Sequence, residues 1–261
     1  MKKPWQIYGY PKPKSEASRG TLSLVDWEIY SGIEIPEKPV FIRLDGWKFH
    51  PLCKRLKLKK PYDRRFASAL VKTSKEFFKT FSCNLAYIFS DEINLLFLKV
   101  PGFKRIEKID SVFAGIASST FSELMKTKAS FDCRCIPMLK KSDIINYLIW
   151  RQAECFRNHN NSWAHQMLMK SGLSASRAQK RLSGMNTAQI QKLVKERFNL
   201  DLFATPAWQR SGILLYKEKY LKEGYDPIKK KKVKVFRFKV KEDWSPPDFR
   251  DKGKKFINSF L

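Results

Sequence analysis

Two aspartates stand where a short apolar run of β-type residues gives way to a turn. Asp45 follows the run at residues 40–44, and Asp91 lies between the runs at 85–89 and 93–100. Magnesium prefers carboxylate oxygens, and two or three acids suffice because the ion keeps several waters and also binds nucleotide phosphates. Two such carboxylates at adjacent strand ends are typical of a site with two Mg²⁺ ions, which catalyses phosphoryl or nucleotidyl transfer.

A glycine directly follows the first of these aspartates. Because Gly46 has no Cβ, a triphosphate or a metal ion can approach its backbone carbonyl closely. Spacing alone also allows a simpler interpretation, in which Asp45-Gly46 is an ordinary turn and Asp91-Glu92 is the acidic tip of a hairpin. The dipeptides by themselves do not decide between the two interpretations.

The elements that must position these acids follow from the hydrophobic periodicity. Alternating or continuous apolar runs predict strands, and apolar residues at three-to-four spacing predict amphipathic helices. In chain order we expect a strand at 40–44, a helix at 64–81, a hairpin of 85–89 and 93–100, a helix at about 107–126 and a strand at 131–136. This β-α-β-β-α-β order predicts an α+β fold with a ferredoxin-like core that resembles a polymerase palm.

The second half of the chain has a more helical pattern and ends in β-type runs. A helix is expected from Ser142 through Trp150, with an interruption at 158–162 before it continues at 163–169. Runs at 212–216 and 233–240 then predict a hairpin with a basic tip. We therefore expect an N-terminal arm at 1–38, a catalytic core at 39–140, and helical and hairpin additions at 141–261 packed on that core.

Composition points to a polyanionic partner. With 43% apolar residues the 261-residue chain can bury a sizeable core, and its formal net charge is +27. So many like charges destabilise the compact state by mutual repulsion unless a polyanion such as nucleic acid is the usual partner. A lysine-rich solubility surface or a thermophile-type composition would give the same net charge. None of the five cysteines forms a C-x-x-C pair, so neither a disulfide framework nor a zinc site is indicated, and Cys133 and Cys135 are expected on one strand face.

Targeting signals do not alter this picture. The sequence has no run of about 18 apolar residues and no signal-type stretch after its basic N-terminus. We therefore expect a cytoplasmic protein that does not contact the membrane.

Several short motifs occur in a fixed order. They are Arg43-Leu44-Asp45-Gly46, Phe49-His50, Lys60-Pro61-Tyr62-Asp63, Ala86-Tyr87, Ser90-Asp91-Glu92, Phe131-Asp132-Cys133-Arg134, Trp150-Arg151-Gln152 and Pro206-Ala207-Trp208-Gln209. This order resembles the signature of the tRNA(His) guanylyltransferase family over roughly residues 39–216. The segment at 156–161 departs from the tRNA(His)-specialised pattern and is more similar to the archaeal and bacterial guanylyltransferase-like branch, which is associated with 5′-end repair. Trp47, where members often have arginine, and Gln189 to Lys192, where they usually have K-N-E, depart from the family pattern itself.

The resemblance implies a function and a set of site residues. Members add nucleotides to the 5′ end of a tRNA in the 3′-to-5′ direction, activating the end with ATP before an incoming GTP or other NTP attacks. It implies two Mg²⁺ ions held by Asp45, the Gly46 carbonyl and Asp91, with Glu92 as a supporting catalytic acid. The positions expected around the nucleotide are Arg43, Phe49, His50, Lys60, Asp63, Ser90, Arg105 and Lys108. A homodimer or homotetramer is also implied.

For the tRNA, we expect basic side chains to neutralise phosphates. The candidates are Arg134, Arg151, Arg157, Asn158, Lys229, Lys230, Lys231 and Lys232. The alternative for each is a solvated surface charge. Two rival functions remain: a palm-fold nucleotide cyclase would use the same acids without RNA, and a non-catalytic RNA-binding protein would keep the basic surface without needing Asp45 and Asp91.

Overall fold

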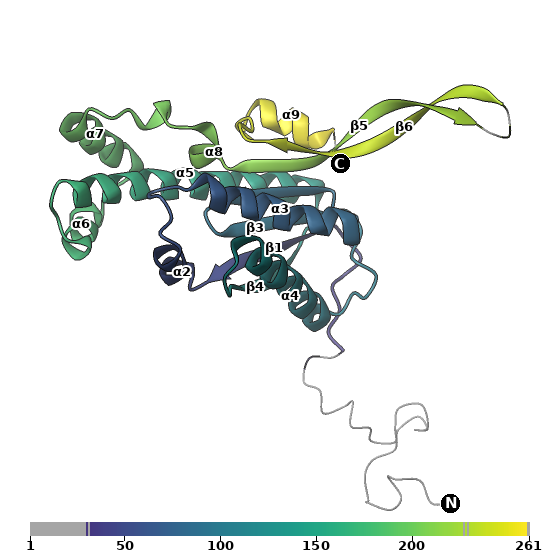
Figure 1. The fold of residues 1–261 in the computed structure, drawn as a ribbon, viewed down its shortest axis with the longest axis horizontal. Helices are drawn as coiled ribbons and strands as arrows, with labels where there is room; N and C mark the ends of the chain where they lie inside the picture. Colours follow the sequence, from purple (N-terminus) through teal and green to yellow (C-terminus); the bar gives the residue numbers. More distant parts are fainter. Residues whose placement is uncertain (1–29, 31, 227, 229, 260–261) are drawn as a thin grey trace, which may run out of the picture.

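Six antiparallel strands form one sheet in the order β4-β1-β3-β2-β5-β6 in the computed structural model of the protein (Figure 1). The strands are β1 (Val40–Trp47), β2 (Leu85–Phe89), β3 (Glu92–Phe97), β4 (Ser130–Pro137), β5 (Ile213–Asp226) and β6 (Lys231–Asp243). The structure describes residues 30, 32–226, 228 and 230–259. Most of the expected N-terminal arm at 1–38 therefore lies outside the described residues.

The first four strands and two long helices form the predicted core. Helix α3 (Arg64–Thr80) connects β1 to β2, and α4 (Ile106–Met125) connects β3 to β4. The β-α-β-β-α-β order and the central strand order β4-β1-β3-β2 confirm the α+β, palm-like prediction. A short helix that we did not predict, α2 (Phe49–Arg55), follows β1 and buries Phe49 and Leu52.

Each face of the sheet is covered by different helices. Alternation along β1 sends Ile42 and Leu44 into a cluster with α3 and α4, and sends Phe41 into a second cluster with α5 (Lys141–Lys170) and α9 (Lys252–Asn258). Residues 43 and 45 share the face of Phe41 by the same alternation. Arg43 and Asp45 of β1 therefore lie on the α5 side of the sheet.

Helix α5 is continuous over 30 residues, so the predicted interruption at 158–162 is wrong. The Asn160 amide donates to the carbonyl of Phe156 (2.6 Å) and the Asn161 amide donates to the carbonyl of Arg157 (3.0 Å). Each side chain thus bonds one turn back along the same helix, which lets asparagine stay inside it. Beyond α5 the helices α6 (Ala175–Leu182), α7 (Thr187–Phe198), η3 (Leu202–Ala204) and α8 (Ala207–Ser211) follow.

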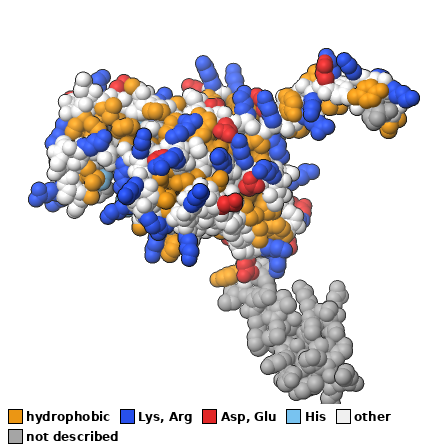
Figure 2. Space-filling model, viewed as in Figure 1, with side chains coloured by type: hydrophobic (Ala, Val, Ile, Leu, Met, Phe, Trp, Pro, Cys, Tyr) orange, Lys and Arg blue, Asp and Glu red, His pale blue; other side chains and the backbone are white. Residues whose placement is uncertain are grey.

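The C-terminal strands confirm the predicted hairpin but are much longer than the apolar runs. Strand β5 pairs with β2 at one end, so the hairpin extends the core sheet, and at its other end it projects well beyond the body (Figure 1). Phe236 and Phe238 are each 63% exposed on this projection. Lysines and arginines lie along the projecting hairpin and are spread over the visible face of the body (Figure 2).

The cysteines lie where the strand pattern places them. All five are free, and Cys133 and Cys135 share the α4 face of β4, as predicted. No helix in the described part of the chain is both long and apolar enough to cross a membrane.

Candidate active site

The two predicted metal-binding aspartates are brought to the same end of the sheet. Asp45 on β1 is paired in register with Glu92 on β3, so Asp91 lies one residue beyond that pair. The backbone N–H of Gly46 donates to the carbonyl oxygen of Asp91 (3.1 Å). The end of β1, which extends to Trp47 and so includes Asp45 and Gly46, is therefore joined directly to the turn between β2 and β3, which places the carboxylates on adjacent strand ends.

Burial and neighbouring charges raise the pKa of both carboxylates. Burial and then the negative charge of Asp45 raise the pKa of Asp91 to about 6. The pKa of Asp45 is also raised, by burial and by the charge of Asp132, while Arg134 and Arg43 act in the opposite direction. Asp132 stands opposite Asp45 on β4. The site therefore concentrates negative charge that a bound cation would relieve.

This donor set fits divalent magnesium. Asp45 and Asp91 supply hard carboxylate oxygens, and no ion pair within the described residues involves either side chain. In the same part of the chain no group of three or more His, Cys, Asp or Glu residues is arranged to hold a metal ion. A protein that offers two carboxylates rather than a complete cage suits Mg²⁺, because this ion completes its octahedron with waters and phosphate oxygens.

A cavity of about 610 Å³ adjoins Asp91. Five of the predicted nucleotide-binding residues line it, namely Phe49, His50, Lys60, Asp63 and Ser90. Lys60, His50 and Ser90 are exposed on its wall. An exposed ammonium group beside a carboxylate pair is suited to the oxygens of a triphosphate.

Asp63 and Phe49 have clear structural roles within this wall. Asp63 caps α3 by accepting from the backbone N–H of Arg65 (2.8 Å), and it also accepts from that of Lys59 (2.9 Å). The Arg65 guanidinium, and to a smaller extent these backbone bonds, lower the pKa of Asp63. Phe49 packs so closely on Gly46 that a Cβ there would lie 2.6 Å from the ring. Gly46 is therefore required for packing as well as for any approach to its carbonyl.

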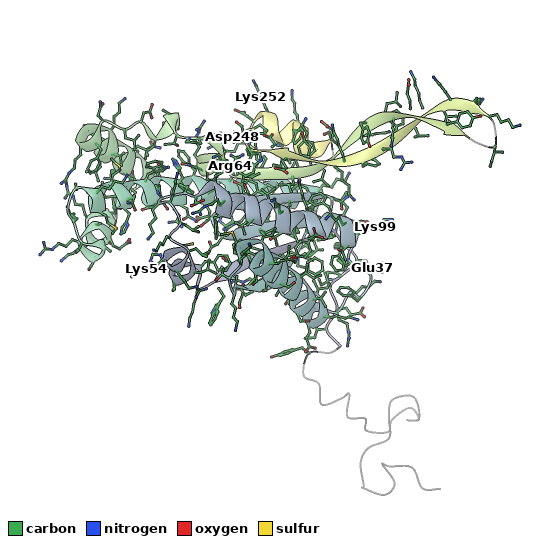
Figure 3. All side chains as sticks on the ribbon, in the orientation of Figure 1. Glu37, Lys54, Arg64, Lys99, Asp248 and Lys252 are labelled. Carbon is green, nitrogen blue, oxygen red and sulfur yellow. The ribbon has the colours of Figure 1, made fainter. Side chains whose placement is uncertain are left out.

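Three other nucleotide candidates do not line the cavity. Arg43 lies two residues before Asp45 on the same face of β1, next to Tyr147. Arg105 forms an isolated β-bridge with Glu34, and Lys108 follows it in α4. Figure 3 shows Lys54 at the end of the sheet that carries Asp45 and Asp91, and Glu37 and Lys99 at the opposite end. Arg105 and Lys108 lie near that opposite end, because Lys104 pairs with Glu37 and Arg105 forms a bridge with Glu34. The structure therefore does not bring these two residues to the acids within one chain.

Two assignments need correction on physical grounds. Glu92 is 6% exposed and both of its oxygens accept from Arg151, at 2.9 and 2.7 Å, so it is not a free catalytic acid. Arg151 is 8% exposed and was expected to contact RNA, but its guanidinium is used inside the protein. No local pattern indicates this pairing, because the partners are 59 positions apart.

The other RNA candidates are accessible where the structure describes them. Arg134 and Arg157 are exposed, although each pairs with a neighbouring acid, Asp132 and Glu154. Asn158 is partly exposed on α5. Lys230, Lys231 and Lys232 are exposed at the end of the hairpin, and Lys229 lies outside the described residues.

Sequence reasoning missed part of the cavity wall. Tyr62, Trp208 and Ser162 line it together with His165 and Gln166 from the later turns of α5. A helix that starts at residue 141 reaches this cavity only because it is unbroken to residue 170. Asp132 was also missed as a neighbour of Asp45, although its place in an alternating strand pattern could have indicated the face it shares.

Comparisons with known proteins agree with this arrangement. A family model described as tRNAHis guanylyltransferase matches residues 27–139, and a second, described as Thg1 C terminal domain, matches residues 142–246. Among curated relatives, tRNA(His) guanylyltransferase 1 of Arabidopsis thaliana is 25% identical over 202 residues. That alignment covers 73% of this chain but 36% of the relative, so the chain spans about a third of that relative's length.

Solved structures of similar proteins include two nucleotide complexes. A bacterial tRNA(His) guanylyltransferase-like protein in complex with ATP aligns with a TM-score of 0.72 and 27% identity, covering 91% of this chain and 97% of its own. A bacterial tRNA(His) guanylyltransferase-like protein in complex with GTP aligns with a TM-score of 0.65 and 26% identity, covering 91% of this chain and 96% of its own. The likeness thus extends over nearly the whole of both chains.

Proposed function

Because the chain belongs to the tRNA(His) guanylyltransferase family, whose members are nucleotidyltransferases, we propose that it adds nucleotides to the 5′ end of a tRNA in the 3′-to-5′ direction. The observation that carries this proposal is the junction of Asp45 and Asp91 beside the cavity lined by Lys60 and His50. The nucleotides bound by the bacterial relatives, ATP and GTP, are proposed as its substrates. The family match also favours a transferase over a nucleotide cyclase or a non-catalytic RNA-binding protein.

Each group in the proposed site has a task. Asp45 and Asp91 would hold two Mg²⁺ ions with the Gly46 carbonyl, and the bound metal supplies charge neutralisation at the phosphates and activation of the attacking hydroxyl. Lys60 would bind triphosphate oxygens, and the aromatic side chains of Tyr62 and Trp208, which line the same cavity, would exclude water from it. Arg43 holds positive charge on the α5 side of Asp45. Arg105 and Lys108 could join this site only from another subunit of the proposed homo-oligomer.

The tRNA is proposed to lie along the exposed basic surface. Lys230, Lys231 and Lys232 project on the hairpin away from the cavity, whereas Arg157 and Asn158 lie on α5, whose later turns line the cavity. Phosphate contacts of this kind provide affinity that does not depend on sequence and falls with salt. The 5′ end would enter the cavity beside Asp91 while the rest of the tRNA meets the basic surface.

A direct assay tests the function. The protein is incubated with Mg²⁺, labelled ATP and GTP and a tRNA that lacks its 5′ nucleotide, alongside Asp45→Ala and Asp91→Ala. Glu196→Ala on α7, an exposed acid paired with Lys192 at 3.8 Å, is the matched control. Extension by the wild type and the control alone supports the proposal. Formation of a cyclic nucleotide, or RNA retention with no extension, contradicts it.

The tRNA's 5′ phosphate separates the two nucleotide roles. A 5′-monophosphate end needs activation, so we expect addition of GTP to it to depend on ATP. A 5′-triphosphate end already carries a leaving group, so we expect GTP addition to proceed without ATP. Equal ATP dependence on both ends would contradict activation by adenylylation.

A further inference from the structure

A buried ion pair connects helix α5 to the residue next to Asp91. Arg151 donates from Nε to Oε1 of Glu92 (2.9 Å) and from Nη2 to Oε2 (2.7 Å), so the pair is bidentate. The Asn94 amide donates to the same Oε1 (2.8 Å). Every oxygen of the Glu92 carboxylate is therefore satisfied inside the protein, away from solvent.

The spacing of helix and strand explains why this contact forms. Tyr147 and Arg151 are one turn apart on α5, a rise of about 6 Å. Asn94 and Glu92 are alternate residues of β3, about 6.6 Å apart along the strand. The Tyr147 hydroxyl donates to Oδ1 of Asn94 (2.6 Å), just as Arg151 bonds Glu92. Two matched contacts thus fix the register of α5 against β3.

Asp91 itself has little else to orient it. Its carboxylate accepts from the hydroxyl of Ser90 (3.1 Å), which belongs to the same turn and has a positive φ of 50°. No ion pair among the described residues reaches it. Its direction therefore depends on the backbone of the turn, which is held on one side by Gly46 and on the other by Glu92.

We propose that Arg151 is a positioning residue. It holds Glu92 in place, so that the adjoining Asp91 presents its carboxylate to the divalent ions in the cavity that the later turns of α5 also line. This inference rests on the proposed function and assigns to Arg151 a role distinct from RNA contact. The alternative is a pair that only stabilises the fold. The variant Arg151→Lys helps to distinguish the two roles, because lysine keeps the positive charge but cannot reproduce the bidentate geometry of the guanidinium.

The test uses Arg151→Lys, Glu92→Gln and the double variant Arg151→Gln with Glu92→Gln in the full chain. Mn²⁺ affinity is measured by electron paramagnetic resonance with GTP and without tRNA, and kcat and KM are measured for 5′ addition. Loss of a residue that orients a metal ligand typically lowers metal affinity or activity by about 10- to 100-fold. We expect that loss in Mn²⁺ affinity and in kcat, with the KM for GTP changed by less than about threefold.

A control separates positioning from loss of stability. Ile190→Ala on α7 removes a side chain that is 1% exposed in the cluster of α5, α6 and α7 and that does not line the cavity, so it lowers the unfolding temperature. Its Mn²⁺ affinity and kcat should match the wild type well below that temperature. The double glutamine variant leaves no unpaired buried charge, so it remains a folded test if a single variant unfolds.

Wild-type Mn²⁺ affinity and kcat in folded Arg151→Lys or in the double variant would overturn the proposal. A change confined to the unfolding temperature would do the same. If the wild type adds no nucleotide to tRNA, the proposed function fails, but Mn²⁺ affinity in these variants still decides whether Arg151 orients Asp91.

Discussion

The backbone N–H of Gly46 donates to the carbonyl oxygen of Asp91 at 3.1 Å, so the last residues of β1 and the turn between β2 and β3, which carry the proposed metal-binding carboxylates, are one hydrogen-bonded unit. This bond lies at the end of the β1–β3 ladder, and Asp91 lines the cavity. The position of each aspartate therefore depends on both segments. Changes in either segment should affect both binding and stability.

Substitution of Gly46 by alanine is expected to destabilise the protein by about 1 to 3 kcal/mol. The new Cβ would lie 2.6 Å from the Phe49 ring, which must move and which lines the cavity. Urea unfolding measures the change. Gly115→Ala in α4, where a Cβ meets nothing within 4 Å, should instead be neutral or stabilising by up to about 1 kcal/mol. Equal effects at the two positions would contradict the packing account.

Lys60→Ala is expected to raise the KM for the nucleotide by about 10- to 150-fold, since a hydrogen bond to a charged group contributes about 1.5 to 3 kcal/mol and each 1.4 kcal/mol is about tenfold. The lysine is exposed on the cavity wall. Lys79→Ala, at the far end of α3 and paired with Glu76 at 2.7 Å, is the matched control. Steady-state kinetics at saturating tRNA provide the measurement. An unchanged KM in Lys60→Ala would remove this residue from the site.

The three described lysines at the hairpin end should contribute to tRNA affinity by neutralising phosphates. Lys230→Gln, Lys231→Gln and Lys232→Gln together should lower the slope of log K against log salt by about 1 for each phosphate that is no longer neutralised. The same change at Lys99, Lys126 and Lys140, which are exposed on the body, is the control. Filter binding over a salt series measures both slopes. If the slope falls equally in the two triple variants, the hairpin makes no special contribution.

His159 is expected to make stability depend on pH. The Thr205 hydroxyl donates to the Leu202 carbonyl (2.7 Å), so it accepts from Nε2 of His159 (2.8 Å), and Nδ1 has no hydrogen-bond partner among the residues that the structure describes. Burial and the charge of Arg210 lower the pKa of His159 to about 4. Because the unfolded chain takes up a proton near pH 6.5, the stabilisation is complete above that pH and is lost as pH falls towards 4.

Between pH 7 and pH 5 this histidine should cost the folded state about 2 kcal/mol of unfolding free energy. Urea unfolding of the wild type and of His159→Gln at both pH values measures it. Glutamine can still donate to Thr205 but does not titrate. The loss of unfolding free energy between pH 7 and pH 5 should therefore be smaller in His159→Gln than in the wild type by about 2 kcal/mol. Parallel losses in the two proteins would show that His159 does not control the pH dependence.

Local patterns were enough to predict the core fold. The helix at Arg64–Thr80 and the strand at Leu85–Phe89 follow from strong 3.6-residue and β-type periodicity, and their observed bounds nearly coincide with the expected ones. Helix α5 was broken in the prediction because asparagines favour turns. In the structure their amides bond carbonyls of the same helix, and its later turns pack against α6 and α7.

The site could be predicted only in part, because sequence locates residues on strands but does not show what they touch. Asp45 and Asp91 were correctly placed together, since adjacent strand ends meet, although the strand of Asp45 runs on to Trp47 where a turn was considered. The pairing of Glu92 with Arg151 depends on how α5 packs across β3, which no local pattern encodes. The same reason explains why Tyr62 and Trp208 were not expected in one cavity wall.

Binding of Mn²⁺ measured by electron paramagnetic resonance in the presence of GTP tests the central claim most directly. Two carboxylates on the end of β1 and the β2–β3 turn joined to it predict two ions per chain, and the affinity should fall sharply in Asp45→Asn and in Asp91→Asn. It should also weaken as pH drops through about 6, where burial and Asp45 place the pKa of Asp91 and protons compete with the metal. Wild-type binding in both variants would contradict the account.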